Sequence, residues 1–353
     1  NSIIEIDHCS PLDVLNLQKN LSTIADGEGI AFVYGKGKKK PEIQRLYEAL
    51  ETCGSRLLEY KESFEIMGKD RNSYSKTDLE ATFMRMKDDH MMNGQLKPAY
   101  NVQIAVENYF IIHSYVSNDR TDYNTLIPIV EKHIKAFGEI LKETTADSGY
   151  CSEKNLLFLK EHHIESYIKL QEHEQRKTRA YKEQIGKYYN MELQVFEDEH
   201  YYICHDGREL RRLRTETKEK EGYKQTLEVY GCADCSGCEH KAKCLYRYNP
   251  EKDVDKNKVM KINERWDELK ETSHTNIQSE KGIRNRQIRS IQTEGHFGDI
   301  KENDHFRRFH HRSAEKVYKE FMLYAIGRNI NKYHRFLCDK LHKFEGKSAE
   351  NAA

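Results

Sequence analysis

The residues best suited to chemistry lie in the stretch from Arg284 to Lys316. Read as a helix, this stretch places Glu294, Phe297 and Lys301 on one face. Cations surround that carboxylate on both sides, and Arg side chains in particular match the geometry of phosphate. They are Arg284, Arg286, Arg289, Arg307, Arg308, His310, His311 and Arg312. A carboxylate within a basic strip indicates a metal site that acts on DNA. The alternative is a solvated amphipathic helix in which Glu294 pairs with a neighbouring arginine.

Composition limits the other possibilities. The chain has 353 residues, 37% of them hydrophobic and 33% charged, which is enough for two domains with a buried core. Lys plus Arg equals Asp plus Glu, so any attraction to nucleic acid must be local. No apolar run is long enough to cross a membrane, and the N-terminus carries no secretion signal. We therefore expect a cytoplasmic protein, and the absence of a starting Met leads us to expect a fragment.

The cysteines indicate a second kind of site. Nine are present, and four of them are packed into the segment YGCADCSGCEHKAKC as Cys232, Cys235, Cys238 and Cys244. Two-residue gaps let thiolates converge on one ion, so this spacing favours a structural Zn²⁺ site over disulfides. Cys204 and His240 are further candidate ligands, and the four that bind remain open. The alternative is a set of free thiols without metal.

The central part of the chain predicts an α/β core. YNVQIAVE and FIIHSYVS form an antiparallel hairpin, a helix follows that is capped near Asn118 to Asp122, and ETTADSGY is a short strand that ends at Asp147. This order is that of an RNase H-like core, and the later strand ESYIKL extends the same sheet. Asp147 is then either a functional carboxylate at a strand end or a helix N-cap.

The flanking segments predict the remaining organisation. We expect helices before the core, a charged insertion of short strands that ends in the cysteine cluster, helices after Pro250 and a frayed tail. The predicted domains are residues 1–70, the core 71–170, the insertion 171–250, the C-terminal helices 251–340 and the disordered tail 341–353.

Several separated motifs resemble one family. SYSKTDLEATFMRMKDDHMMNGQLKPAYNVQ, TADSGYCSEKN, the cysteine cluster and IRNRQIRSIQTEGHFGDIKENDHFRRF occur in the order found in DDE transposases of bacterial insertion sequences. The sequence is most similar to the IS1182 group within the IS4-like assembly. The resemblance begins near Asp70 and covers most of the chain from there on.

The resemblance implies roles for individual residues. Asp147 matches the second acid of the catalytic triad, Glu294 matches the last acid, and Lys301 matches a lysine that touches DNA near the cleavage site. Two departures stand out: Ser290 replaces an arginine expected four residues before Glu294, although Arg289 is adjacent, and the strand that carries the first acid is missing. We expect that strand upstream of the first residue. Asp78 is the best remaining acid within the resemblance, and Asp7 is the best by strand position.

The chemistry that follows is DNA cleavage and strand transfer. Carboxylates that hold two Mg²⁺ ions support in-line displacement at phosphorus, and Mg²⁺ suits oxygen ligands. The expected partners are transposon ends and target DNA, bound by a homo-oligomer, with Arg286, Arg289, Arg307 and Arg308 beside Lys301 on the phosphodiester backbone. Two other classes of function stay open, a DNA-binding remnant without catalysis and a zinc-stabilised interaction module without a DNA role.

Overall fold

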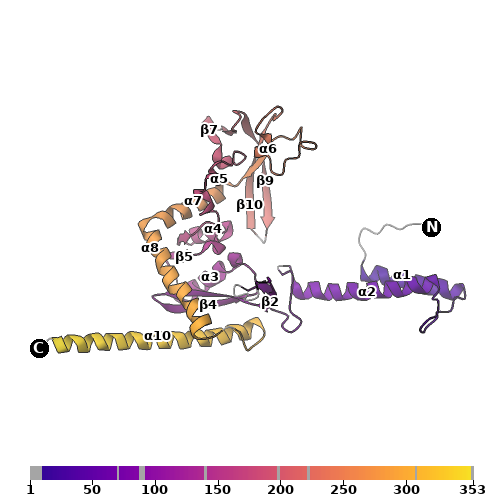
Figure 1. The fold of residues 1–353 in the computed structure, drawn as a ribbon, viewed down its shortest axis with the longest axis horizontal. Coiled ribbons are helices and arrows are strands. Elements are labelled where there is room, and N and C mark those ends of the chain that lie inside the picture. Colours follow the sequence, from indigo (N-terminus) through magenta and orange to yellow (C-terminus); the bar gives the residue numbers. More distant parts are fainter. Residues whose placement is uncertain are drawn as a thin grey trace. The chain divides into compact units, whose positions relative to one another are not determined.

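The computed structural model describes residues 10–69, 71–86, 92–138, 141–196, 199–220, 223–306 and 308–350. The chain divides into two compact units, Asn1–Tyr100 and Asn101–Ala353. Asp7 and Arg307 lie outside the described residues. The mixture of helices and strands agrees with the predicted α/β class (Figure 1).

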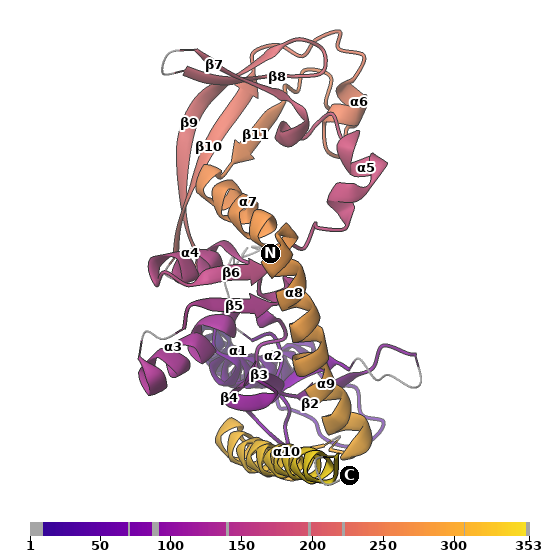
Figure 2. The same cartoon turned by 90° about the vertical axis from the view of Figure 1, so that its left-hand side faces the viewer.

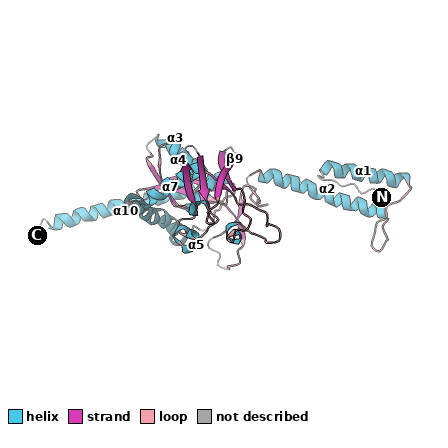
Figure 3. Ribbon diagram, turned by 90° about the horizontal axis from the view of Figure 1, so that it is seen from above, coloured by secondary structure: helices cyan, strands magenta, loops and turns pink. Residues whose placement is uncertain are grey.

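The first unit is built on two packed helices, α1 (Pro11–Gly27) and α2 (Glu42–Met67) (Figure 3). Ser10 and Asp13 form a capping box at the start of α1, which satisfies backbone N–H groups that have no helical partner. Gly54 of α2 is close enough to α1 that a Cβ there would lie 3.2 Å from Cγ1 of Val14. A short antiparallel pair, β1 (Thr82–Arg85) and β2 (Leu96–Ala99), follows. Residues 10–69 thus contain two helices in the region where the sequence predicts helices.

The second unit begins with the predicted hairpin, β3 (Asn101–Glu107) and β4 (Phe110–Ser117). Then come α3 (Leu126–Phe137), β5 (Glu143–Ala146), α4 (Glu153–Glu161) and β6 (Glu165–Ile168). β5 and β6 pair in parallel, and buried side chains of α3, α4 and β6 share one hydrophobic core. The structure differs from the single sheet expected from the sequence. Among the described residues, β3–β4 and β5–β6 are two separate pairs, because no strand joins β3 to β5 (Figure 2).

A five-stranded antiparallel sheet forms the segment predicted as an insertion. Its strands are β7 (Glu192–Phe196), β8 (Glu199–Ile203), β9 (Glu209–Lys220), β10 (Tyr223–Cys232) and β11 (Val259–Ile262). The short helices α5 (Arg179–Lys182) and α6 (Lys241–Cys244) flank it, and 3₁₀ turns cover Gln175–Lys177 and Tyr188–Asn190. The prediction of helix throughout the region after Pro250 is wrong at β11. Met260 and Ile262 alternate with exposed residues there and bury themselves in the sheet's core.

The C-terminal region contains α7 (Glu264–Gln278), α8 (Glu280–Arg289), α9 (Gly295–Gly298) and α10 (Ala314–Glu350). Two π-helical segments, Ser290–Glu294 and Asp299–Asn303, flank α9. Phe321 of α10 packs with Ile300 and Ile111 in a second core, which confirms that α10 buries an apolar face. The expected disorder of the tail is wrong up to Glu350, because the helix continues to that residue.

Beyond this core, α10 exposes large apolar side chains at alternating spacings of three and four residues. They are Leu323, Ile326, Ile330, Tyr333 and Leu337. No helix in the described part of the chain combines the length and the apolar character needed to cross a bilayer.

Candidate active site

Asp147 follows β5 directly, as the sequence predicts. Its Oδ1 accepts a hydrogen bond from the backbone N–H of Gly149 at 2.8 Å, so it caps the 3₁₀ turn Ser148–Tyr150. Ser152, rather than Asp147, caps the following helix α4. The carboxylate is therefore oriented by its own turn, and the residue itself is exposed to solvent.

Asp122 lies beside Asp147, and this neighbour was not identified from the sequence. Its Oδ1 accepts hydrogen bonds from Asn101 at 2.7 Å and Gln103 at 2.8 Å, both on β3. A Cβ placed on Gly149 would lie 2.9 Å from Oδ2 of Asp122 and 3.0 Å from Oδ1 of Asp147. The two carboxylates therefore border the same small space, which is open only because residue 149 has no side chain.

Tyr150 connects this pair to the C-terminal helices. Its hydroxyl donates to Oε1 of Gln103, the same residue that holds Asp122. Burial raises the pKa of Tyr150, and the charges of Asp122 and Asp147 raise it further, while Arg289 lowers it. The Arg289 guanidinium is thus close enough to act on the same group as the two acids.

Arg289 binds the third candidate acid, Glu294. Nη2 of Arg289 lies 2.7 Å from Oε1 of Glu294, and Oγ of Ser290 donates to Oε2 at 2.9 Å. The π-helical turn explains the first contact, since residues five apart are stacked in π geometry. The expected arginine is replaced by Ser290, yet Arg289 still reaches the glutamate. In this structure Glu294 makes the pair with a neighbouring arginine that the sequence offered as the alternative to metal binding.

The irregular helix also changes the face predicted from the sequence. Glu294 is exposed, whereas His296 and Ile300 are buried and Phe297 packs against the core of Ile300 and Phe321. Glu294 and Phe297, which the sequence predicts on one face, therefore have different surroundings in the structure.

Contacts with the core hold this segment in place (Figure 2). Lys281 at the start of α8 lies 2.5 Å from Glu143 and 2.8 Å from Glu165, at the starts of β5 and β6. Further along, Oε1 of Gln292 accepts from the backbone N–H of Tyr109 at 3.2 Å, and the ring of His296 bonds the carbonyl of Tyr109 at 2.9 Å. These contacts hold the segment that carries Glu294 against the β5–β6 pair at one end and against the β3–β4 turn at the other.

The remaining basic candidates have different surroundings. Lys301 is half-buried and Arg308 is exposed. Arg286 is partly buried, and its Nε has no hydrogen-bond partner among the described residues. Among the predicted DNA-binding residues, Arg289 contacts a candidate acid, Glu294.

Asp78 belongs to the first unit and is held within its own turn. Its Oδ2 accepts from the Tyr100 hydroxyl at 2.9 Å, and its Oδ1 accepts from the backbone N–H of Glu80 at 3.3 Å. Both oxygens stabilise the local loop, which agrees with a structural role.

The five candidate zinc ligands gather at one end of the five-stranded sheet. Cys232 and Cys235 are buried in its core, and Cys204 packs against them. Burial raises the pKa of Cys244. The neighbouring Lys258 lowers this pKa, whereas Cys204, Cys235 and Cys238 raise it further. Cys204, which is distant in sequence, thus lies with the clustered cysteines in this part of the sheet. Among the described residues, however, no three His, Cys, Asp or Glu side chains are arranged closely enough to hold an ion.

The donor chemistry fits the two expected metals to different degrees. Asp122 and Asp147 offer adjacent carboxylate oxygens, the ligand type that Mg²⁺ prefers and of which it often uses only one or two. Thiolates suit Zn²⁺, which takes four ligands in a structural site. Four of these cysteine side chains would have to move closer to one another to bind one ion.

Comparison with protein families places residues 203–334 in a match to the family model described as the transposase DDE domain. The match supports a DDE transposase. It includes Glu294, Lys301 and all five clustered cysteines, whereas Asp122 and Asp147 lie outside it. No curated protein and no solved structure matches the chain.

Proposed function

We propose that this protein is a metal-dependent transposase that cleaves and joins DNA strands of an insertion sequence of the IS1182 group. The observation that carries the proposal is the pair of carboxylates, Asp122 and Asp147, that border the same space beside Gly149. Glu294 is added because Arg289, which binds it, acts through its charge on Tyr150 of the same turn. The family match supports the same class of protein independently of that geometry.

The chain's own residues supply the elements of the reaction. Mg²⁺, when bound, would supply the activation of water and the stabilisation of the leaving 3′-oxygen. Asp122 and Asp147 would bind the Mg²⁺ through their carboxylates, and Glu294 would complete the ligand set once it separates from Arg289. Arg289 would then be available for the phosphodiester that reacts, since a guanidinium binds phosphate as readily as carboxylate. The freed 3′-hydroxyl can attack a second phosphodiester with the same acids in place.

The proposed core is RNase H-like with a strand that carries the first acid between β3 and β5. Support comes from the pairs β3–β4 and β5–β6, which no described strand joins. Asp122 and Tyr150 connect the two pairs through Gln103 of β3. The five-stranded sheet forms the proposed insertion, which ends at β11 rather than at residue 250. Structural Zn²⁺ in this insertion is part of the proposal, supported by the five gathered thiols.

The proposed partners are transposon ends and target DNA, bound in the cytoplasm by a homo-oligomer. The exposed apolar residues of α10 support self-association, because large unpaired apolar patches mark interaction surfaces.

The test compares Glu294→Gln with Lys301→Ala in protein made from the whole coding sequence. Glu294→Gln should abolish Mg²⁺-dependent cleavage of duplex DNA while binding is kept, because a metal ligand is lost and phosphate contacts remain. Lys301→Ala should weaken binding to all sequences alike and reduce the slope of log K against log salt by about one charge.

DNA binding without cleavage is the second candidate, and the Arg289–Glu294 pair favours it. In that case neither the parent protein nor either variant cleaves, although salt-sensitive binding persists. Cleavage that survives in Glu294→Gln would show that Glu294 is only a surface acid paired with arginine and would reject its proposed role.

A further inference from the structure

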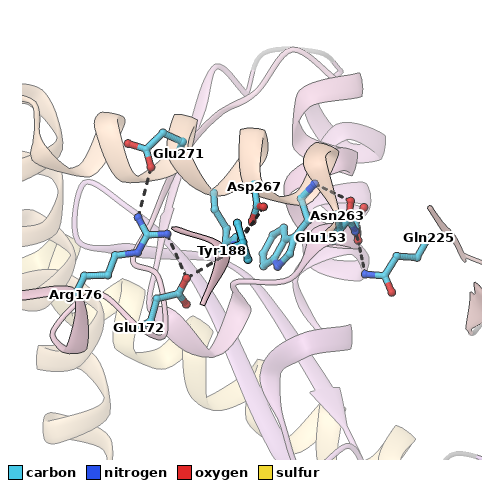
Figure 4. Close-up of polar contacts among 10 residues, drawn as sticks. Glu153, Glu172, Arg176, Tyr188, Gln225, Asn263, Asp267 and Glu271 are labelled. Carbon is cyan, nitrogen blue, oxygen red and sulfur yellow. Dashed lines mark hydrogen bonds and ion pairs between the residues drawn. The ribbon is translucent and has the colours of Figure 1, made fainter. Parts of the chain in front are cut away.

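A cavity of about 960 Å³ lies between the start of the insertion and α7. Its walls come from the segment Glu172–Asn190, from Lys258 to Lys261 beside and within β11, and from the exposed side of α7. Figure 4 shows part of this region, where Arg176 and Tyr188 approach the acids of α7. Protein cavities that bind small ligands measure about 300–1,000 Å³, so this one is large enough for a nucleotide. The candidate active site does not use it.

The carboxylates that line the cavity all have cationic partners. Arg176 binds two of them, one on each side of its guanidinium (Figure 4). Tyr188 donates to a third, Oδ2 of Asp267, at 2.6 Å. The ion pairs are Glu172–Arg176, Glu271–Arg176, Asp267–Lys270 and Glu268–Lys160. Acidic side chains in the wall are therefore neutralised.

Three lysines in the wall lack such partners. In the described part of the chain, no carboxylate forms an ion pair with Lys182, Lys187 or Lys258, which all line the cavity. Nζ of Lys258 donates to the carbonyl of Cys244 at 3.1 Å, and the charge of Lys187 is close enough to repel it. The cavity wall thus carries positive charge that no carboxylate of the described residues neutralises. A bound anion would reduce the repulsion between Lys187 and Lys258.

Aromatic rings stand beside these lysines. Tyr181 and Tyr189 stack with their centroids 4.6 Å apart and their planes 4° from parallel, and Tyr189 is partly exposed. The amide of Asn190 holds their loop by donating to the carbonyls of Tyr181 and Gln184. Gly186 lets the loop approach closely, since a Cβ there would lie 2.3 Å from the carbonyl oxygen of Cys244. The rings are therefore held in place before any ligand arrives.

We propose that this cavity binds a nucleotide unit, with its phosphate near Lys182, Lys187 and Lys258 and its base against Tyr189. Cations next to a rigid aromatic ring form the arrangement by which proteins bind single-stranded nucleic acid without sequence preference. The ligand is either a free mononucleotide or an unpaired nucleotide of a DNA strand. The second source extends the proposed DNA role to a site outside the acids.

Binding is measured by calorimetry with thymidine 5′-monophosphate and, separately, with a thymidine oligonucleotide, in buffer without added Mg²⁺. Tyr189→Ala should weaken binding about fivefold or more, because the stacking surface is lost. Tyr189→Phe keeps the ring and should bind as the parent does. Lys187→Ala should weaken binding and reduce the salt slope for the oligonucleotide by about 0.7. Lys319→Ala, on α10 and away from the cavity wall, is the matched control and should change neither.

The two ligands distinguish the sources. Binding of both, with loss in the cavity variants, supports a site for free nucleotides, and binding of the oligonucleotide alone supports a site for unpaired DNA. The proposal is overturned if Tyr189→Ala and Lys187→Ala bind as Lys319→Ala does, or if neither ligand binds the parent. Lys187 is exposed, so its variant decides the matter even where Tyr189→Ala disturbs the loop. Omitting Mg²⁺ prevents cleavage during the measurement, so this result does not depend on whether Glu294 is catalytic.

Discussion

Asp122 and Asp147 point their carboxylates at the same side of Gly149, with one oxygen of each within 3.0 Å of the position that a Cβ would occupy. Two carboxylates this close repel each other unless a cation or a proton lies between them. Both belong to turns that precede helices, so each alone has the sequence signature of a cap. Only the fold shows that they form a pair.

Asp122→Asn should reduce Mg²⁺-dependent DNA cleavage by at least about 10–100-fold, because the loss of a proposed metal ligand costs no less than the loss of a group that orients one. The amide keeps the shape of the side chain and can still accept from Asn101, but it removes the charge. Asp119→Asn is the matched control, because Asp119 lies three residues earlier and contacts Ser117 instead. Equal cleavage by both variants would exclude Asp122 from the site.

Gly149→Ala tests the same pair without changing charge. A methyl group at less than about 3.0 Å from both carboxylates forces them to move, so cleavage should fall while DNA binding is kept. Gly138→Ala cannot serve as its control because φ is 76° there, but Gly295→Ala can, since a Cβ at Gly295 would meet open space. A Gly149→Ala protein with parental cleavage would show that the space between the acids is not used.

Glu153→Gln should destabilise the fold by about 1.5–3 kcal/mol, the range for hydrogen bonds to a charged group. The buried carboxylate accepts from Gln225 at 2.9 Å, Asn263 at 2.6 Å and Arg265 at 3.0 Å, and so ties α4 to β10 and to the start of α7 (Figure 4). Denaturant unfolding measures the change, with the exposed Glu161→Gln on the same helix as the control. A loss no larger than that of Glu161→Gln would mean that this junction adds little stability.

The insertion should bind about one Zn²⁺ per chain, measured by elemental analysis of protein purified without chelator. Cys238→Ser should lower this content, because Cys238 belongs to the gathered thiols. The exposed Cys53 lies on α2, so Cys53→Ser should leave the zinc content unchanged. Metal-free protein whose thiols are reduced would favour the alternative of free cysteines.

Thermal stability should fall on acidification, and His113 should contribute. Burial lowers the pKa of His113 below 6.5, and the nearby His133 and Lys132 lower it further. Below pH 6.5, His113 binds a proton in the unfolded chain but not in the folded chain. Stability is therefore lost as the pH falls from 6.5 towards the lowered pKa. His113→Phe keeps a ring beside Phe137 and should show a smaller drop in Tm between about pH 7.5 and about pH 5. An equally steep drop in that variant would show that other groups cause the loss of stability. The buried His173 and His296, whose pKa values burial also lowers, are the next candidates.

The sequence predicts an element correctly where the local residue pattern itself defines that element. The alternation in β3 and β4 and the strand end at Asp147 are visible in the residues themselves. Asp122 was missed because its pairing with Asp147 depends on how the 3₁₀ turn Asp122–Asn124 packs against the turn Ser148–Tyr150. β11 was missed because a four-residue strand between charged segments has too short a pattern to distinguish it from a helix. The Arg289–Glu294 pair could not be anticipated, since hydrophobic periodicity does not reveal a π turn.

The π-helical turns make this segment sensitive to length rather than to composition. Each turn contains about one residue more than an α turn, so a one-residue deletion within Ser290–Glu294 would allow a regular α-helix and leave the following side chains close to their present orientation. Ile300 would then stay in its core, but the spacing of five residues across a π turn that brings Arg289 to Glu294 would be lost. The Arg289–Glu294 pair therefore depends on the number of residues in this turn, while exposed positions here, such as Ile291, should accept many substitutions.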